Sequence, residues 1–183
     1  MRKIISVFCL ILVFFIIYFL QVNFFSWFNI ANVKPNLFII LVLFIGLFAN
    51  KKVAAVFGFF IGIYLDILTS KQVGISSIIF ALIGYLGGFL DKTFSKESKI
   101  TIILMVLGST CVYESILYIY NTISSKAIFD ILGFNKILII EVVFNCLMTI
   151  ILYPIIRNCG NILERIFKSK KTVTLFLNWN AKE

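Results

Sequence analysis

Six long apolar segments constrain the fold of this chain more than any other feature of its sequence. They lie at about residues 4–20, 35–49, 53–68, 73–90, 100–120 and 137–156. A membrane-spanning helix needs about 20 apolar residues, within a range of about 17–25. The first, fourth, fifth and sixth segments have this length, whereas the second and third are shorter. We therefore predict an all-α protein, a polytopic membrane helix bundle with about six transmembrane helices.

The composition excludes the soluble alternatives to such a bundle. Apolar residues make up 61% of the 183 residues, charged residues only 14%, and histidine is absent. A soluble domain averages about half apolar and a quarter charged residues. A soluble fold of this size has no interior that could hold the 21 phenylalanines. The bilayer is therefore the solvent that fits this chain, and a soluble globule, a disordered chain and a disulfide scaffold are excluded.

The second and third segments allow two arrangements because only Asn50-Lys51-Lys52 separates them. Pro35 suits the first position of a helix, where its missing N–H costs little. A second helix that begins there is about 24 Å long at a rise of about 1.5 Å per residue, which is marginal for a span. The alternative is a re-entrant hairpin that leaves four true spans and places both lysines within the membrane. We favour six spans.

The distribution of basic residues predicts the orientation. With the N-terminus inside, the outer segments hold only four of the 17 Lys and Arg residues: Lys34, Lys71, Lys126 and Lys136. This asymmetry obeys the positive-inside rule, so we expect both termini in the cytoplasm. The formal net charge of +9 then indicates contact with anionic membrane lipids. Nucleic acid is not an expected partner, because no basic patch with interleaved aromatic residues occurs.

The segments outside the predicted spans are short. We expect residues 1–156 to form a single transmembrane domain and residues 157–183 a basic cytoplasmic tail. Within the tail, one helical face is apolar and should rest on the inner leaflet: Ile162, Leu163, Ile166 and Phe167. In the longest outer loop, residues 127–132 are a candidate for a short helix lying flat at the interface.

The sequence offers no catalytic or metal-binding set. With no histidine, nucleophiles activated by histidine and histidine metal sites are excluded. The four cysteines form no CxxC pair, and no glycine-rich phosphate loop or zinc spacing occurs. We therefore predict that the protein is not an enzyme and holds no cofactor or metal.

Three acidic residues fall within the predicted spans: Asp66, Glu114 and Glu141. An ionised carboxylate at the bilayer centre costs at least about 2.5 kcal/mol, so such residues tend to face the interior of a bundle. The helical rise places them about 3, 9 and 6 Å from the outer ends of their spans. Asn145 lies one turn from Glu141 on the same face. We expect these four residues to form one polar cluster that opens outward, stabilises packing or receives a partner or ligand, and holds at least one protonated acid.

The alternative for the acids is that each reaches the outer interface alone. We consider this alternative as plausible as the cluster for Asp66 and Glu141. It is harder to defend for Glu114, which lies deeper.

Glycines mark the third and fourth segments. Gly58 and Gly62 form a GxxxG pattern, and Asp66 follows one turn later on the same face. Gly84 and Gly88 repeat the spacing on the next segment. Small residues at this spacing let helices approach closely in lipid, so we predict that all four pack against neighbouring helices. Gly74 follows a short turn and is expected to satisfy a backbone need.

These motifs together resemble a known bacterial family. Lys34-Pro35-Asn36 opens the second segment, Gly58-x3-Gly62-x3-Asp66 fills the third, Gly74 follows the turn and Tyr85 lies in the fourth. With one N-terminal anchor and a basic tail, the chain resembles the rod shape-determining protein MreD family. The resemblance is firmest over about residues 35–90. Asn36 is a departure, because the family often has an acid after the proline.

The resemblance implies a function that the composition does not. It implies a non-enzymatic membrane subunit of the lateral wall-synthesis machinery, which maintains rod shape. The implied partners are the bitopic protein MreC, the actin-like protein MreB, and the glycan polymerase and transpeptidase of wall synthesis. The implied fold resembles the six-helix substrate-binding subunits of energy-coupling-factor vitamin transporters.

Such a vitamin-binding subunit is also the main alternative function, because it has the same length and number of spans. These subunits usually present a small-residue face on their first helix to the coupling partner. Here Ser6 and Cys9 are the only small residues of the first segment, which argues against this alternative. A lipid-modifying enzyme is a third class, and it would need a catalytic set that the sequence lacks.

Overall fold

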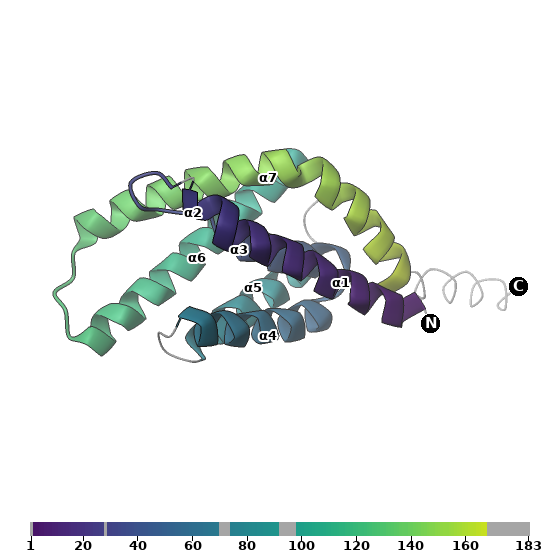
Figure 1. Cartoon of the computed structure of the whole chain (residues 1–183), viewed down its shortest axis with the longest axis horizontal. Coiled ribbons are helices and arrows are strands. Elements are labelled where there is room, and N and C mark those ends of the chain that lie inside the picture. The colour runs from purple at the N-terminus through teal and green to yellow at the C-terminus, as the bar shows by residue number, and fades with distance from the viewer. Residues whose placement is uncertain (1, 28, 70–73, 92–97, 168–183) are drawn as a thin grey trace, which may run out of the picture.

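The computed structural model of the chain consists of helices joined by short connections (Figure 1). The structure describes residues 2–27, 29–69, 74–91 and 98–167. The first helix continues through a five-residue π-helical turn into a short helix, and five longer helices follow. The elements are α1 (Arg2–Phe19), the turn Leu20–Phe24, α2 (Phe25–Trp27), α3 (Leu37–Phe48), α4 (Lys51–Thr69), α5 (Ile75–Leu90), α6 (Lys99–Ser125) and α7 (Ile131–Phe167). The predicted all-α class is confirmed.

Each of the six predicted apolar segments coincides with one long helix, namely α1 and α3 to α7. Two of these are long and apolar enough to cross a membrane, α6 over Lys99–Ser125 and α7 over Ile131–Asn161. Shorter apolar helices lie at Ile11–Phe24, Leu37–Phe48 and Ile75–Leu90. The helices therefore form a membrane bundle.

Helix α3 is the core of the bundle. All 12 of its residues are buried, and it packs against α1, α4, α5, α6 and α7. None of its residues is polar, as expected for a helix that is surrounded by other helices. Its 12 residues are only about 18 Å long at the usual helical rise.

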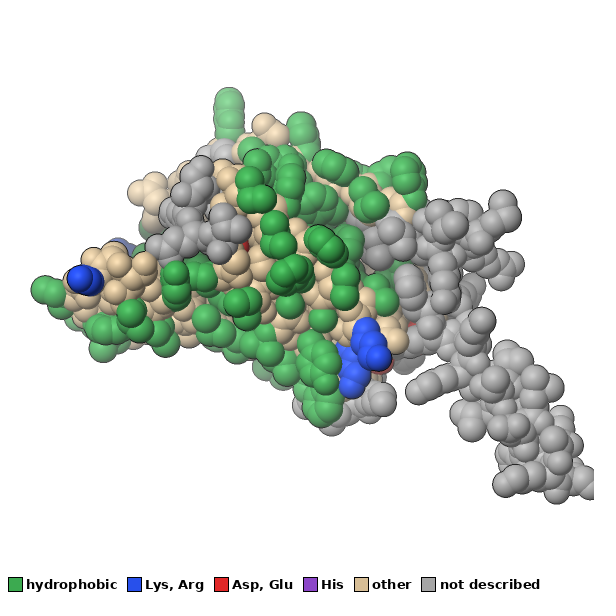
Figure 2. All heavy atoms as spheres, turned by 90° about the horizontal axis from the view of Figure 1, so that it is seen from below, with side chains coloured by type: hydrophobic (Ala, Val, Ile, Leu, Met, Phe, Trp, Pro, Cys, Tyr) green, Lys and Arg blue, Asp and Glu red, His purple; other side chains and the backbone are tan. Residues whose placement is uncertain are grey.

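The outer face of the bundle is apolar. Figure 2 shows hydrophobic side chains over most of one face, with Lys and Arg side chains toward the two ends of the molecule. Large apolar side chains such as Phe60, Ile78 and Leu104 are more than half exposed. A soluble protein rarely exposes so large an apolar surface, so this face suits contact with lipid.

Two glycines of α4 bring that helix against the backbone of α5. A Cβ atom added to Gly58 would lie 2.5 Å from the carbonyl oxygen of Phe80. A Cβ atom added to Gly62 would overlap the backbone of Ser77. No larger side chain fits at either position unless the two helices separate.

Two glycines of α5 make the reciprocal contacts with α4. A Cβ atom on Gly84 would lie 2.6 Å from the carbonyl oxygen of Ala54, and one on Gly88 would lie 2.5 Å from the Cα of Lys51. Gly46 of α3 has the same relation to the carbonyl oxygen of Gly84, at 2.6 Å. Glycines therefore hold α3, α4 and α5 together by contact between their backbones.

Aromatic rings, rather than small residues, attach α1 to this core. The ring of Phe14 lies 5.8 Å from that of Phe38 in α3 and 5.4 Å from that of Tyr64 in α4. The ring of Tyr18 lies 5.6 Å from the same Tyr64. Aromatic side chains, rather than close backbone contacts at glycines, therefore join α1 to the core.

Helices α6 and α7 extend beyond their predicted spans and form a hairpin whose tip projects past the other helices (Figure 1). The rings of Tyr118 and Phe134 stack at 4.3 Å and join the two helices of the hairpin. The expected interfacial helix at residues 127–132 is wrong. Lys126 ends α6 in a left-handed conformation with φ of 52°, and Asp130 starts α7 by accepting the N–H of Gly133 at 3.0 Å.

Helix α7 bends and continues to Phe167 (Figure 1), with Pro154 inside it. In its last turns Leu163 packs against the core. The other three side chains of the expected apolar tail face, and residues 168–183, lie outside the described part of the chain. The same holds for the cations expected at positions 71, 92 and 96.

The glycine contacts give a prediction for stability. The variant Gly62→Ala should lower the free energy of unfolding by about 1–3 kcal/mol, because the added methyl group overlaps the backbone of α5. The measurement is thermal unfolding of the purified chain in detergent. The control is Gly108→Ala in α6, where an added Cβ meets nothing within 4 Å. Equal losses in both variants would contradict this role of the α4–α5 contact.

Candidate functional site

The carboxyl groups of Glu114 on α6 and Glu141 on α7 lie within interaction range of each other. Glu141 is only 6% exposed. Two ionised carboxylates close to each other in the bundle interior would repel each other strongly. The pair therefore marks an electrostatically demanding contact between the two longest helices.

Asn145 lies one turn along α7 from Glu141 and bonds two other elements of the site. Its side chain, which is fully buried, donates to the hydroxyl of Thr110 on α6 at 3.0 Å. Its carboxamide oxygen accepts the backbone N–H of Asn36 at 2.7 Å. Asn145 thus ties α6, α7 and the residue before α3 together.

Gln21 completes the attachment of the start of α3. Its amide nitrogen donates to the carbonyl oxygen of Pro35 at 2.6 Å, and its amide oxygen accepts the N–H of Leu37 at 3.0 Å. The first N–H groups of a helix have no partner within the helix, so side chains must satisfy them where water is absent. Gln21 performs this role from the π-helical turn after α1.

Asp66 serves the start of α5 in a similar way. Its carboxylate accepts the N–H of Gly74 at 2.7 Å and the hydroxyl of Ser77 at 3.5 Å, and the residue is 4% exposed. The positive end of the helix dipole at the start of α5 favours this negative charge. Gly74 has φ of +118°, a conformation that residues with a Cβ rarely adopt.

The structure therefore places the four candidate residues in two adjoining groups. Glu114, Glu141 and Asn145 lie together between α6 and α7, whereas Asp66 holds the α4–α5 turn. Tyr113 lies within electrostatic range of all three acids and near Ser76, the neighbour of Ser77. Tyr113 and Ser76 thus lie where the two groups meet.

A cavity of about 550 Å³ lies beside the glutamate pair. Among the side chains that line it are Glu114, Glu141 and Tyr113, with Lys34 and Asn36 from the segment before α3. The side-chain oxygen of Asn36 is buried and has no hydrogen-bond partner among the described residues. The cavity can therefore offer hydrogen-bond acceptors and one lysine to a small polar group. No cluster of three or more acids or cysteines within the described ranges could hold a metal.

Sequence reasoning missed several polar residues of this site: Gln21, Ser76, Ser77, Thr110 and Tyr113. No local pattern marks these five residues, but the sequence holds another signal, a polar residue at every fourth position of α7: Glu141, Asn145, Thr149, Tyr153 and Arg157. Residues four apart form one ridge of a helix, so this spacing indicates a polar stripe. The first four of these residues are indeed buried.

The comparison with protein families decides the identity of the chain. A family described as rod shape-determining protein MreD matches residues 1–159. The chain belongs to the MreD family. The matched range covers every residue of the candidate site, from Gln21 to Asn145. No curated protein and no solved structure gives a match.

Membership establishes the general role. A chain of the MreD family is a rod shape-determining membrane protein, and the bundle of apolar helices agrees with that assignment. The family is described as a shape-determining one.

The bonds of Asn145 give a second prediction. The variant Asn145→Ala should lower the free energy of unfolding by about 1–3 kcal/mol, because it leaves the N–H of Asn36 without its partner. Thermal unfolding in detergent measures the change. Asn135→Ala, at an exposed position of the same helix, is the matched control and should have little effect. A loss at Asn145 no larger than that at Asn135 would show that the bonds contribute nothing to stability.

Proposed function

We propose that this chain is a non-enzymatic subunit of the bacterial cell-elongation machinery that maintains rod shape by binding other proteins of that assembly. The observation that carries the proposal is the MreD family match over residues 1–159. The proposed partners are an MreC-like bitopic protein, the actin-like MreB, and the glycan polymerase and transpeptidase of wall synthesis.

The proposed setting is the bacterial plasma membrane, crossed six times with both termini in the cytoplasm. The excess of basic residues in the inner segments supports this orientation. The six long helices, whose lengths range from 12 to 37 residues, support the number of crossings. The shortest of them, α3, is enclosed by the other helices, so its own length does not need to match the thickness of the bilayer.

A groove on the lipid-facing surface is the proposed seat for the single transmembrane helix of the MreC-like partner. It has a volume of about 510 Å³, lies between α5 and α6, and is lined mainly by apolar side chains such as Leu86 and Leu104. Gly108 also lines it, with open space where its Cβ would be. An apolar groove with a small residue lets another membrane helix approach closely, because van der Waals packing drives association in lipid.

The cellular test uses depletion and rescue in a rod-shaped host. Depletion should give round cells, and the wild-type chain should restore rods and co-purify with the MreC-like protein. We expect Gly108→Leu to fill the groove, to lower the co-purified amount severalfold and to rescue shape poorly. The control Val143→Leu also enlarges an apolar side chain, at a position of α7 that is 53% exposed and outside the groove.

The outcomes of this test distinguish the proposed function from the proposed binding groove. Cells that remain rods after depletion would overturn the proposed function. Round cells after depletion, together with full rescue and normal co-purification by Gly108→Leu, would overturn only the groove as the seat of the partner.

A vitamin-binding transport subunit is the second candidate, and the cavity of about 550 Å³ is the observation that favours it. Its test is titration of the purified chain with water-soluble vitamins by calorimetry. The shape-determining role predicts no nanomolar binding. Nanomolar binding that is lost in Glu114→Ala and retained in Asn135→Ala would favour the transporter.

A further inference from the structure

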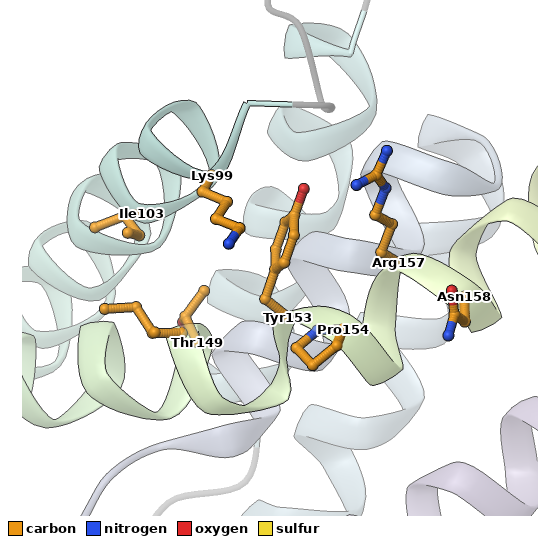
Figure 3. Close-up of a pocket in the computed structure, with 8 residues that line it drawn as sticks. Lys99, Ile103, Thr149, Tyr153, Pro154, Arg157 and Asn158 are labelled. Atoms are coloured by element: carbon orange, nitrogen blue, oxygen red, sulfur yellow. The ribbon is translucent and has the colours of Figure 1, made fainter.

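A second cavity lies between the start of α6 and the bend of α7, away from the glutamate pair. It has a volume of about 640 Å³ and is shown in Figure 3. From α6 it is lined by Lys99 and Ile103. From α7 it is lined by Thr149, Ile150, Tyr153, Pro154, Arg157 and Asn158.

Pro154 accounts for the shape of this region. A proline inside a helix lacks the N–H that would bond the carbonyl four residues earlier, and its ring pushes that carbonyl away, so the helix bends. Past the bend, α7 returns to the core, since a Cβ on Gly160 would lie only 2.6 Å from the ring of Phe48. The cavity lies along the bend, and α6 forms its other wall.

Two cations face this cavity from different helices. The ammonium group of Lys99 lies 5.6 Å from the centre of the Tyr153 ring. Figure 3 shows Tyr153 between Lys99 and Arg157, with its hydroxyl on the same side as the guanidinium group. No acid is among the described residues that line the cavity. Its described lining therefore brings two positive charges and no negative one.

The rest of the lining is suited to a lipid rather than to a free ion. Tyr153 and Thr149 bring hydroxyl groups and Asn158 a carboxamide, whereas Ile103, Ile150 and Pro154 form apolar walls. Ile150 is 54% exposed on the lipid side, and Leu104, beside Ile103, is 61% exposed. Positive charge at one end and exposed apolar surface beside it match the two parts of a phospholipid.

We propose that this cavity binds the phosphate headgroup of an anionic phospholipid. Lys99 and Arg157 contact the phosphate oxygens, and an acyl chain lies along Ile103 and Ile150. Basic pockets between membrane helices on the cytoplasmic side are suited to anionic headgroups. In the proposed orientation this lipid belongs to the inner leaflet. The site goes beyond the proposed function, and it joins α6 to α7 at the end of the hairpin opposite its loop.

The test measures lipid binding by the purified full-length chain in a neutral detergent. Phosphatidylglycerol, phosphatidylcholine and inorganic phosphate are added separately, and retained lipid is counted by native mass spectrometry while thermal unfolding is followed. We expect phosphatidylglycerol alone to be retained and to raise the unfolding temperature. Stabilisation by phosphate alone to the same degree would overturn the lipid as the ligand.

Variants separate this site from general attraction to positive charge. In the double variant Lys99→Gln with Arg157→Gln, affinity for phosphatidylglycerol should fall roughly 30-fold. Each cation near an anionic lipid contributes about 1 kcal/mol of binding free energy, and the variant removes two. The matched control, Lys126→Gln with Lys136→Gln, removes two cations near the loop of the same hairpin and should keep full affinity.

The single variant Arg157→Gln guards against misfolding, because Arg157 is exposed and its loss removes no bond within the described structure. It should keep the wild-type unfolding temperature without lipid and lose part of the stabilisation by lipid. Wild-type affinity in both Arg157→Gln and the double variant, or an equal loss in the loop control, would overturn the site.

Discussion

The contact between the backbones of α4 and α5 is the constraint on which the rest of the structure depends. In lipid no hydrophobic force drives helices together, because the solvent is as apolar as the side chains. Close packing must supply the attraction, and the glycines at positions 58, 62, 84 and 88 supply it by removing the atoms that would keep the helices apart. Gly46 extends the same contact to α3. This three-helix core fixes where α3 and α5 begin, and the polar residues of the candidate site are arranged around these two points.

The polar bonds of the site have two different origins. Gln21 and Asn145 satisfy backbone groups where α3 begins, and Asp66 does so before α5. Such bonds are obligatory in a bilayer, where an unsatisfied backbone group costs several kcal/mol. The pair Glu114–Glu141 is different, because it satisfies no helix end. Most polar residues of the site are therefore explained by the need to satisfy the ends of helices. The glutamate pair and its cavity are not, so they are the part of the site that a partner or ligand can use.

The sequence predicts which residues are helical far better than it predicts how the helices face each other. Apolar length locates each long helix, and GxxxG spacing singles out glycines that lie at close contacts. Orientation is harder, because a membrane helix is apolar toward both lipid and protein. In α3 every residue is apolar, so no periodicity indicates a face. The separation of Asp66 from the glutamate pair, and the bonds of Gln21 to Pro35 and Leu37, depend on tertiary distances that no local pattern encodes.

The polar ridge of α7 connects the cavity beside the glutamate pair with the cavity at the bend. Glu141 lines the first, Thr149, Tyr153 and Arg157 line the second, and Asn145 lies between them. The hydroxyl of Thr149 donates to the carbonyl oxygen of Asn145 at 2.7 Å, so the ridge does not place an unpaired hydroxyl in the core. Burial of the first four residues and exposure of Arg157 show that the ridge passes from the interior to the surface. Because one helix carries both ends, a shift of α7 at the bend near Pro154 would move groups that face both cavities.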